Sequence, residues 1–144
     1  MGNHKKHYIL WDGIVKKLEQ FKKAGILYVN EDDIDLMKTY VCKNHPNLDE
    51  SIHCYACAEA GRIKYKKNST DSKCYYCPID WRRDFGVTIN YCGRPKSSYR
   101  RLIHGRNIDD AILLAIKIRD AEWKYETQCF KNSISTVRLR ISKV

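Results

Sequence analysis

The sequence predicts a mainly α-helical protein with a minor β component (α+β), folded as a single small domain of 144 residues. Three segments space their apolar residues three or four positions apart, as amphipathic helices do. The centre is irregular and rich in cysteine, and the end alternates between apolar and polar residues. A chain of this length can bury one modest core. We expect one domain over residues 1–144, with a central module at 53–92 and a C-terminal extension at 125–144 that ends in a strand.

The first predicted helix lies within residues 7–25. Lysines lie opposite an apolar stripe that comprises Leu10, Trp11, Ile14, Val15, Leu18 and Phe21. Gly25 follows the last turn and is expected to end the helix. Gly13 lies inside the pattern and weakens it, since glycine is unfavourable within a helix. Residues 26–29 predict either a short strand or an extended connector.

Two further helices begin after good N-cap residues. Asn30 precedes a turn rich in acids, which complement the helix N-terminus. The buried face there is expected to hold Ile34, Met37, Tyr40 and Val41. Asn107 caps the last helix, with a predicted buried stripe of Ile112, Leu113, Ala115, Ile116 and Trp123. In residues 135–144, Val137, Leu139 and Ile141 alternate with arginines, which is typical of a half-buried strand.

Composition limits the class of protein. With 43% hydrophobic and 31% charged residues, the chain is neither disordered nor membrane-spanning. Its first residues lack the apolar run of a secretory signal, so we expect a soluble, cytoplasmic protein. The net charge is +10, and residues 61–106 hold twelve Lys and Arg against three acids. Such a segment suits nucleic acid or an acidic protein surface, or is a solvated face that keeps the chain soluble.

Four cysteines form two Cys-x-x-Cys pairs, Cys54 with Cys57 and Cys74 with Cys77, separated by sixteen residues. This spacing is typical of a tetrahedral zinc site, because two residues between thiolates let both sulfurs reach one ion. A site closed by four cysteines is structural, since catalysis needs an open position. The alternative is four buried or redox-active thiols without metal. Redox catalysis is disfavoured because no βαβ pattern accompanies either pair.

Other ligands remain open alternatives. His53 or Cys92 could replace one of the four cysteines. Cys42 and His45 form a Cys-x-x-His pair, which we interpret as a core thiol and a surface histidine. Cys129 is expected to be buried. Pro78 ends the second turn, and Ile79 and Trp81 are expected to cover the metal from solvent.

With these residues placed, the chain resembles a family of small phage and prophage proteins. The family's features are a Cys-x-x-Cys that enters a short helix, a second pair followed by Pro and Trp, a later Cys, and a helix closing with Ile-Arg-Asp and Trp. Here they read CYACAEA at 54–60, CYYCPIDW at 74–81, Cys92 and AIKIRDAEW at 115–123. The resemblance covers about residues 50–124, with LWDGIVKKL at 10–18 more loosely similar. The tail after Trp123 departs from the family's short ending.

The resemblance implies zinc binding and a phage setting, hence the cytoplasm of a host cell, and it implies no catalytic residues. Small phage accessory proteins often bind host machinery, and anti-CRISPR inhibitors of effector nucleases are among them. By this analogy the expected partner is a host protein such as a CRISPR effector nuclease, with neither a membrane nor a small-molecule substrate.

Catalytic motifs are absent from the sequence. A zinc deaminase needs His-x-Glu followed by Pro-Cys-x-x-Cys, whereas here the proline follows the second pair. Neither a zincin motif, a nucleophile elbow nor a phosphate-binding glycine loop occurs. His104 lacks the partner that an HNH-type nuclease requires. We therefore expect a protein without enzymatic activity.

The candidate binding residues are cations interleaved with tyrosines: Arg62, Lys64, Tyr65, Lys66, Lys67, Arg82, Arg83, Arg94, Lys96, Tyr99, Arg100 and Arg101. Arg and Tyr often carry the energy of protein interfaces, which favours inhibition of a host protein. The alternative is direct DNA or RNA binding, with cations on phosphates and aromatic rings on bases. We expect Tyr65 and Tyr99 to be exposed. Trp81 and one of Tyr75 and Tyr76 are expected to be buried against the cysteine turns.

Overall fold

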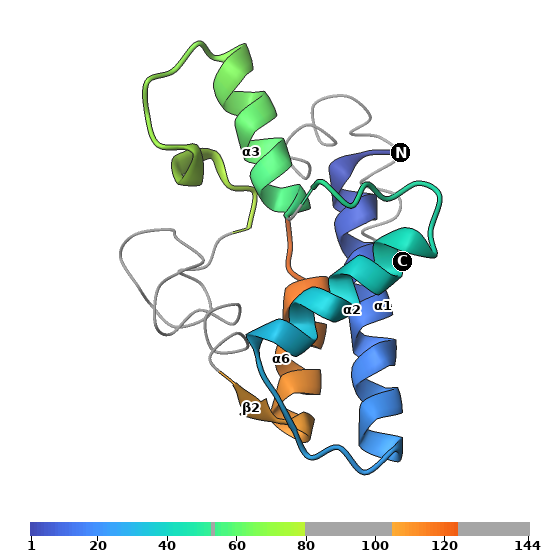
Figure 1. The fold of residues 1–144 in the computed structure, drawn as a ribbon. Helices are drawn as coiled ribbons and strands as arrows, with labels where there is room; N and C mark the ends of the chain where they lie inside the picture. Colours follow the sequence, from blue (N-terminus) through green and yellow to red (C-terminus); the bar gives the residue numbers. More distant parts are fainter. Residues whose placement is uncertain (53, 80–104, 124–144) are drawn as a thin grey trace, which may run out of the picture.

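The computed structural model describes residues 1–52, 54–79 and 105–123, and its helices and small sheet confirm the mainly helical part of the predicted fold class (Figure 1). The elements in these ranges are α1 (Asn3–Lys23), β1 (Tyr28–Val29), α2 (Glu31–Lys43), α3 (Tyr55–Lys66), the 3-10 turn η1 (Lys73–Tyr76), β2 (Arg106–Asn107) and α6 (Ile108–Arg119). The predicted strand at 135–144 lies outside the described residues, as does the rest of the C-terminal extension.

Helix α1 contacts each of the other three helices (Figure 1). Five of its six predicted apolar residues are buried, and Phe21 packs partly buried at the edge. Gly25 ends the helix as predicted, with φ at +84°, where a side chain would be strained. The N–H groups of Gly25 and Ile26 donate to the carbonyls of Lys22 and Phe21, at 3.1 and 3.0 Å. These two bonds form a Schellman motif.

Gly13 lets α1 and α2 approach closely. A Cβ built on Gly13 would lie 2.7 Å from Cγ1 and 2.8 Å from Cγ2 of Val41. Atoms do not pack at such distances, so any side chain at position 13 would push the helices apart. The glycine that weakened the sequence pattern is therefore explained by the helix crossing.

Helix α2 begins as predicted at Asn30. The Asn30 side chain accepts from the Asp33 N–H at 3.1 Å, and the Asp33 carboxylate accepts from the Asn30 N–H at 3.0 Å, which forms a capping box. Ile34, Met37 and Val41 are buried, but Tyr40 is 50% exposed and the prediction for it was wrong. Its ring lies at the margin of the apolar face, where it packs under the ammonium group of Lys17.

Helix α6 begins as predicted, since Asn107 accepts from the Asp110 N–H at 2.9 Å. Its buried face is rotated from the predicted one. Ala115 and Trp123 are buried as expected, whereas Ile112 and Ile116 are only half-buried and Leu113 is 66% exposed. The face that packs inward consists of Ile108, Ala111, Leu114, Ala115 and Ile118. This face packs against α1, and its two alanines are completely buried.

Of the two alternatives predicted for residues 26–29, the structure has a short strand, limited to β1, which pairs antiparallel with β2. Tyr28 lies opposite Asn107, and the Leu27 carbonyl accepts from the Ile108 N–H at 2.9 Å. Gly105 precedes β2 with φ at +89°, and a Cβ there would lie 2.6 Å from the Tyr28 hydroxyl. This sheet of two short strands therefore ties the end of α1 to the start of α6.

The centre of the chain is more regular than its residues alone indicated. Residues 55–66 form helix α3, which buries Tyr55, Ala56, Ala60 and Ile63. Only the resemblance suggested a helix here. η1 returns beside α3 in Figure 1 and packs against it, so the segments that carry the two cysteine pairs are neighbours in space.

Candidate metal centre and binding surface

Cys54 is the N-cap residue of α3. Its backbone is extended, with φ at −152° and ψ at 113°, and its sulfur accepts from the Cys57 N–H at 3.4 Å. Serine, threonine, asparagine and aspartate usually take this role, because a side-chain acceptor satisfies a free N–H of the first turn. Here a sulfur does so, and the helix therefore begins at the first cysteine pair.

The start of α3 stabilises the thiolate of Cys54. The pKa of Cys54 is lowered to about 6, most of all by a hydrogen bond from the Cys57 side chain, although burial opposes this. The backbone N–H groups of Cys57 and Ala56 and the charge of Lys38 contribute to the same lowering. A thiolate is the form of cysteine that binds metal ions. The first pair is therefore suited to supply two ligands.

Cys77 lies buried directly after η1. Lys73 of η1 packs over Gly61 of α3, where a Cβ would lie 3.1 Å from the Lys73 Cε. Pro78 and Ile79 are buried, and Ile79 forms a β-bridge with Trp123. The segment of the second pair is therefore held against α3 through η1 and, through Ile79, against the residues that follow α6.

The complete four-cysteine site stays a prediction. The side chain of Cys74 lies outside the described part of the structure, as do His53, Trp81, Cys92 and Cys129. Among the described side chains, no three His, Cys, Asp or Glu residues gather closely enough to hold a metal ion. The structure brings Cys54 and Cys57 together, and they fit one half of a zinc site.

Cys42 is a core thiol, as interpreted from the sequence. It is buried, and burial raises the pKa of its thiol, with smaller contributions from Glu50 and Asp49. His45 is half-buried, and its Nδ1 accepts from the Asn47 N–H at 3.3 Å. This contact orders the turn after α2.

The last turns of α3 carry an exposed basic surface. Tyr65 is 89% exposed, as predicted, and Lys66 and Lys67 are exposed beside it. Lys64 is half-buried. We call these four residues, Lys64 to Lys67, the α3 surface. Lysines here also complement the negative end of the helix dipole, so part of their role is structural.

Arg62 differs from its neighbours, because its guanidinium holds Glu59. Arg62 Nε and Nη2 donate to the two carboxylate oxygens of Glu59 at 3.0 and 2.7 Å. This contact is the main reason that the pKa of Glu59 is lowered. A guanidinium whose Nε and Nη2 both donate to Glu59 is less available to a ligand. Arg62 is therefore a weaker candidate for binding than the sequence suggested.

One of the two tyrosines Tyr75 and Tyr76 is buried, as predicted. Tyr76 is buried and Tyr75 is exposed, and their rings meet edge to face at 5.1 Å. The other candidate binding residues lie outside the described residues: Arg82, Arg83, Arg94, Lys96, Tyr99, Arg100 and Arg101.

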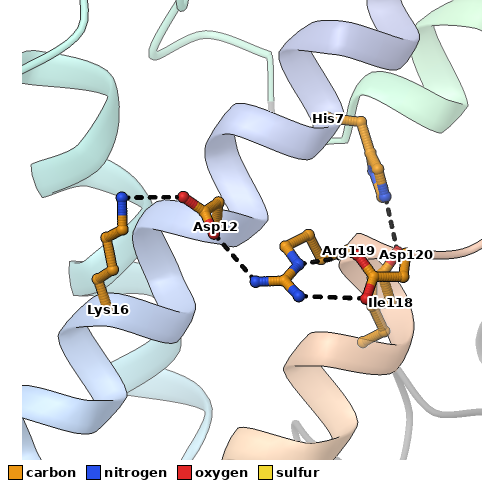
Figure 2. A network of polar contacts seen from close by, with 6 residues as sticks. All are labelled: His7, Asp12, Lys16, Ile118, Arg119 and Asp120. Atoms are coloured by element: carbon orange, nitrogen blue, oxygen red, sulfur yellow. Dashed lines mark hydrogen bonds and ion pairs between the residues drawn. The ribbon is translucent and has the colours of Figure 1, made fainter.

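A polar network between α1 and α6 was not expected from the sequence (Figure 2). Asp12 accepts from Arg119 Nη1 at 3.0 Å, and Arg119 also donates to both carboxylate oxygens of Asp120 at 2.9 and 3.1 Å. His7 Nε2 lies 2.8 Å from the Ile118 carbonyl oxygen, which makes it the protonated ring nitrogen. The Ile-Arg-Asp run was noted only as part of the resemblance, yet its arginine joins two helices.

Comparison with family models, curated proteins and solved structures found no match. No helix in the described residues is both long and apolar enough to cross a membrane.

Proposed function

We propose that this protein is a non-enzymatic, zinc-stapled binding module that binds and inhibits host machinery, as a phage counter-defence protein would. Its target would be a nucleic-acid-handling host protein such as a CRISPR effector nuclease. The zinc would be structural and held by Cys54, Cys57, Cys74 and Cys77. The α3 surface would be part of the contact with the target.

The geometry of α3 carries this proposal. The helix begins at a cysteine pair that stabilises a thiolate, and it ends in a tyrosine that is 89% exposed among lysines. Tyrosine is enriched among interface residues that dominate binding energy, so Tyr65 is a candidate contact with the target. A metal at the start of the helix would fix the direction in which Tyr65 points.

The charge pattern favours a protein target over nucleic acid. Glu59 neutralises Arg62, and Asp71 lies in the turn after α3. Mixed charges suit the rim of a protein interface, where they set orientation and partner choice. The second candidate, direct DNA or RNA binding, is supported by Tyr65 lying beside Lys66 and Lys67, which could stack on a base and neutralise phosphates.

Metal analysis tests the staple. Freshly purified protein should contain about one equivalent of zinc, and Cys54→Ala or Cys74→Ala should retain less than half. Cys42→Ala is the matched control, because it removes a buried thiol outside the site and should keep its zinc. Full zinc retention in Cys74→Ala would refute the four-cysteine assignment.

A capture experiment from host lysate tests the α3 surface. Wild-type protein should retain a host nucleic-acid-handling protein that Tyr65→Ala loses. Tyr75→Ala should still capture it, since this control removes another exposed tyrosine from a different element. Equal capture by Tyr65→Ala would rule out the α3 surface.

Gel shifts over a salt series test the alternative. Direct nucleic-acid binding should weaken steeply as salt rises, because bound cations displace counterions from phosphates. An absence of binding to duplex and single strands at low salt would eliminate it.

A further inference from the structure

A groove runs between α1 and α2 and contains two adjoining clefts. The larger cleft, of about 350 Å³, lies between Tyr8 and Lys16 of α1 and Val41 of α2. The smaller, of about 230 Å³, is lined by Phe21, Leu36 and Met37. Lys17 and Tyr40 line both clefts, so they form the boundary between them. The groove does not include the α3 surface.

The cation at this boundary is available to a ligand. Lys17 Nζ lies 3.5 Å from the centroid of the Tyr40 ring, and it forms no ion pair with any described residue. By contrast, Lys16 is paired with Asp12 at 3.0 Å. An ammonium group held over a ring is fixed in position, which prepares it for an acidic group.

The acids that line the groove already have partners. Asp12 is held by Lys16 and by Arg119, both at 3.0 Å (Figure 2). Asp33, at the smaller cleft, closes the capping box with Asn30. Among the described residues, the larger cleft is lined by Lys16, Lys17 and the single acid Asp12, so its lining carries one positive charge in excess. At the smaller cleft, Asp33 keeps its charge and balances Lys17.

Large apolar side chains around the groove face solvent. Leu36 is 69% exposed, Tyr40 is 50% exposed and Tyr8 is 45% exposed. Single exposed apolar residues are ordinary, but several gathered around concave surface mark a site of interaction. These three lie on both sides of Lys17, two on α2 and one on α1.

We infer that this groove binds an acidic peptide segment of a partner protein, with a carboxylate at Lys17 and apolar side chains in the two clefts. Charge decides against one other occupant. Residues 124–144 of this chain carry five Lys and Arg and one acid, so they would bring like charge to Lys17, which is unfavourable in an interface. The inference does not depend on zinc or on the α3 surface.

Selection from a random 16-residue peptide display library tests this inference, with the full-length protein as target. The enriched peptides should combine Asp or Glu with large apolar residues. A synthetic, fluorescein-labelled copy of the strongest should lose about tenfold or more in affinity with Lys17→Glu, since like charges then face each other. Leu36→Asp should weaken it similarly. Both residues lie at the surface, so circular dichroism should report an unchanged fold.

Lys66→Glu is the matched control, because it makes the same change in net charge outside the groove. Its affinity for the peptide should equal that of the wild type. If Lys66→Glu and Lys17→Glu weakened the affinity for the peptide equally, the effect would be general charge attraction, and the inference would be overturned. Enrichment of peptides without acids would also overturn it, as would self-association of the protein through this groove in sedimentation measurements.

Discussion

Acidification from pH 7 to pH 4 should destabilise this protein through His7. The imidazole is 2% exposed and lies against Trp123, with ring centroids 5.3 Å apart. The pKa of His7 is lowered from 6.5 to about 4, mainly because the ring is buried and in smaller part because His4 and Lys38 lie near it. The hydrogen bond to the Ile118 carbonyl opposes this shift but does not cancel it.

The size of the effect follows from the difference between the folded and unfolded pKa. Between pH 6.5 and 4 the unfolded chain binds a proton at His7 that the folded protein excludes. The free energy of unfolding therefore decreases as the pH is lowered through this range. A shift of about 2.5 units corresponds to about 3 kcal/mol in the free energy of unfolding. Above pH 6.5 both states hold a neutral ring, and His7 adds no pH dependence.

Urea unfolding of wild type and His7→Gln at each half pH unit would measure this effect. Glutamine cannot titrate, and acids such as Asp120 and Glu59 are common to both proteins, so their contributions cancel in the difference. The wild type should lose about 3 kcal/mol relative to the variant between pH 7 and 4. Parallel stability curves would refute the buried, neutral state of His7.

Three further predictions concern packing and capping, each measured by urea unfolding. Gly13→Ala should lower the free energy of unfolding by about 1 kcal/mol, because overpacking against Val41 exceeds the gain in helix propensity. In a protein that already carries Val41→Ala, the same change should have no such cost. On α6, Leu113→Gln should change stability by less than about 0.5 kcal/mol, whereas Ala115→Leu should cost about 1 to 3 kcal/mol; a cost of several kcal/mol for Leu113→Gln would return Leu113 to the buried face predicted from sequence. Asn30→Ala should cost about 1 kcal/mol, and an unchanged midpoint would contradict the capping box.

Much of the helical framework could be predicted because its signals are local. The Asn30 and Asn107 caps act on N–H groups three residues away, and Gly25 ends α1 through its own φ angle. The apolar stripe of α1 was predicted correctly because lysines occupy its other side. The division between Tyr75 and Tyr76 and the exposure of Tyr65 also followed from sequence.

Where a helix lacks a clear contrast between an apolar side and a charged side, its buried residues could be assigned only from the tertiary structure. Helix α6 is apolar on several sides, so periodicity could not choose between Leu113 and Ala111 for the core. Packing in the tertiary structure decided it, and it buries Ala111 and Ala115 completely. Tyr40 was placed in the core for a related reason, since the pattern of α2 could not reveal that Lys17 of another helix lies over its ring.

The candidate sites divide in the same way. The sequence alone determined that two Cys-x-x-Cys motifs are present, that the chain is basic, and where the helices with an asparagine cap begin, because these depend on residue type and short spacing. Tertiary structure decided that Cys54 caps α3, that Arg62 is held by Glu59, and that Arg119 joins Asp12 across 107 residues. Only packing could bring Lys17 and Tyr40 together between two clefts, since a contact between helices depends on how their surfaces fit.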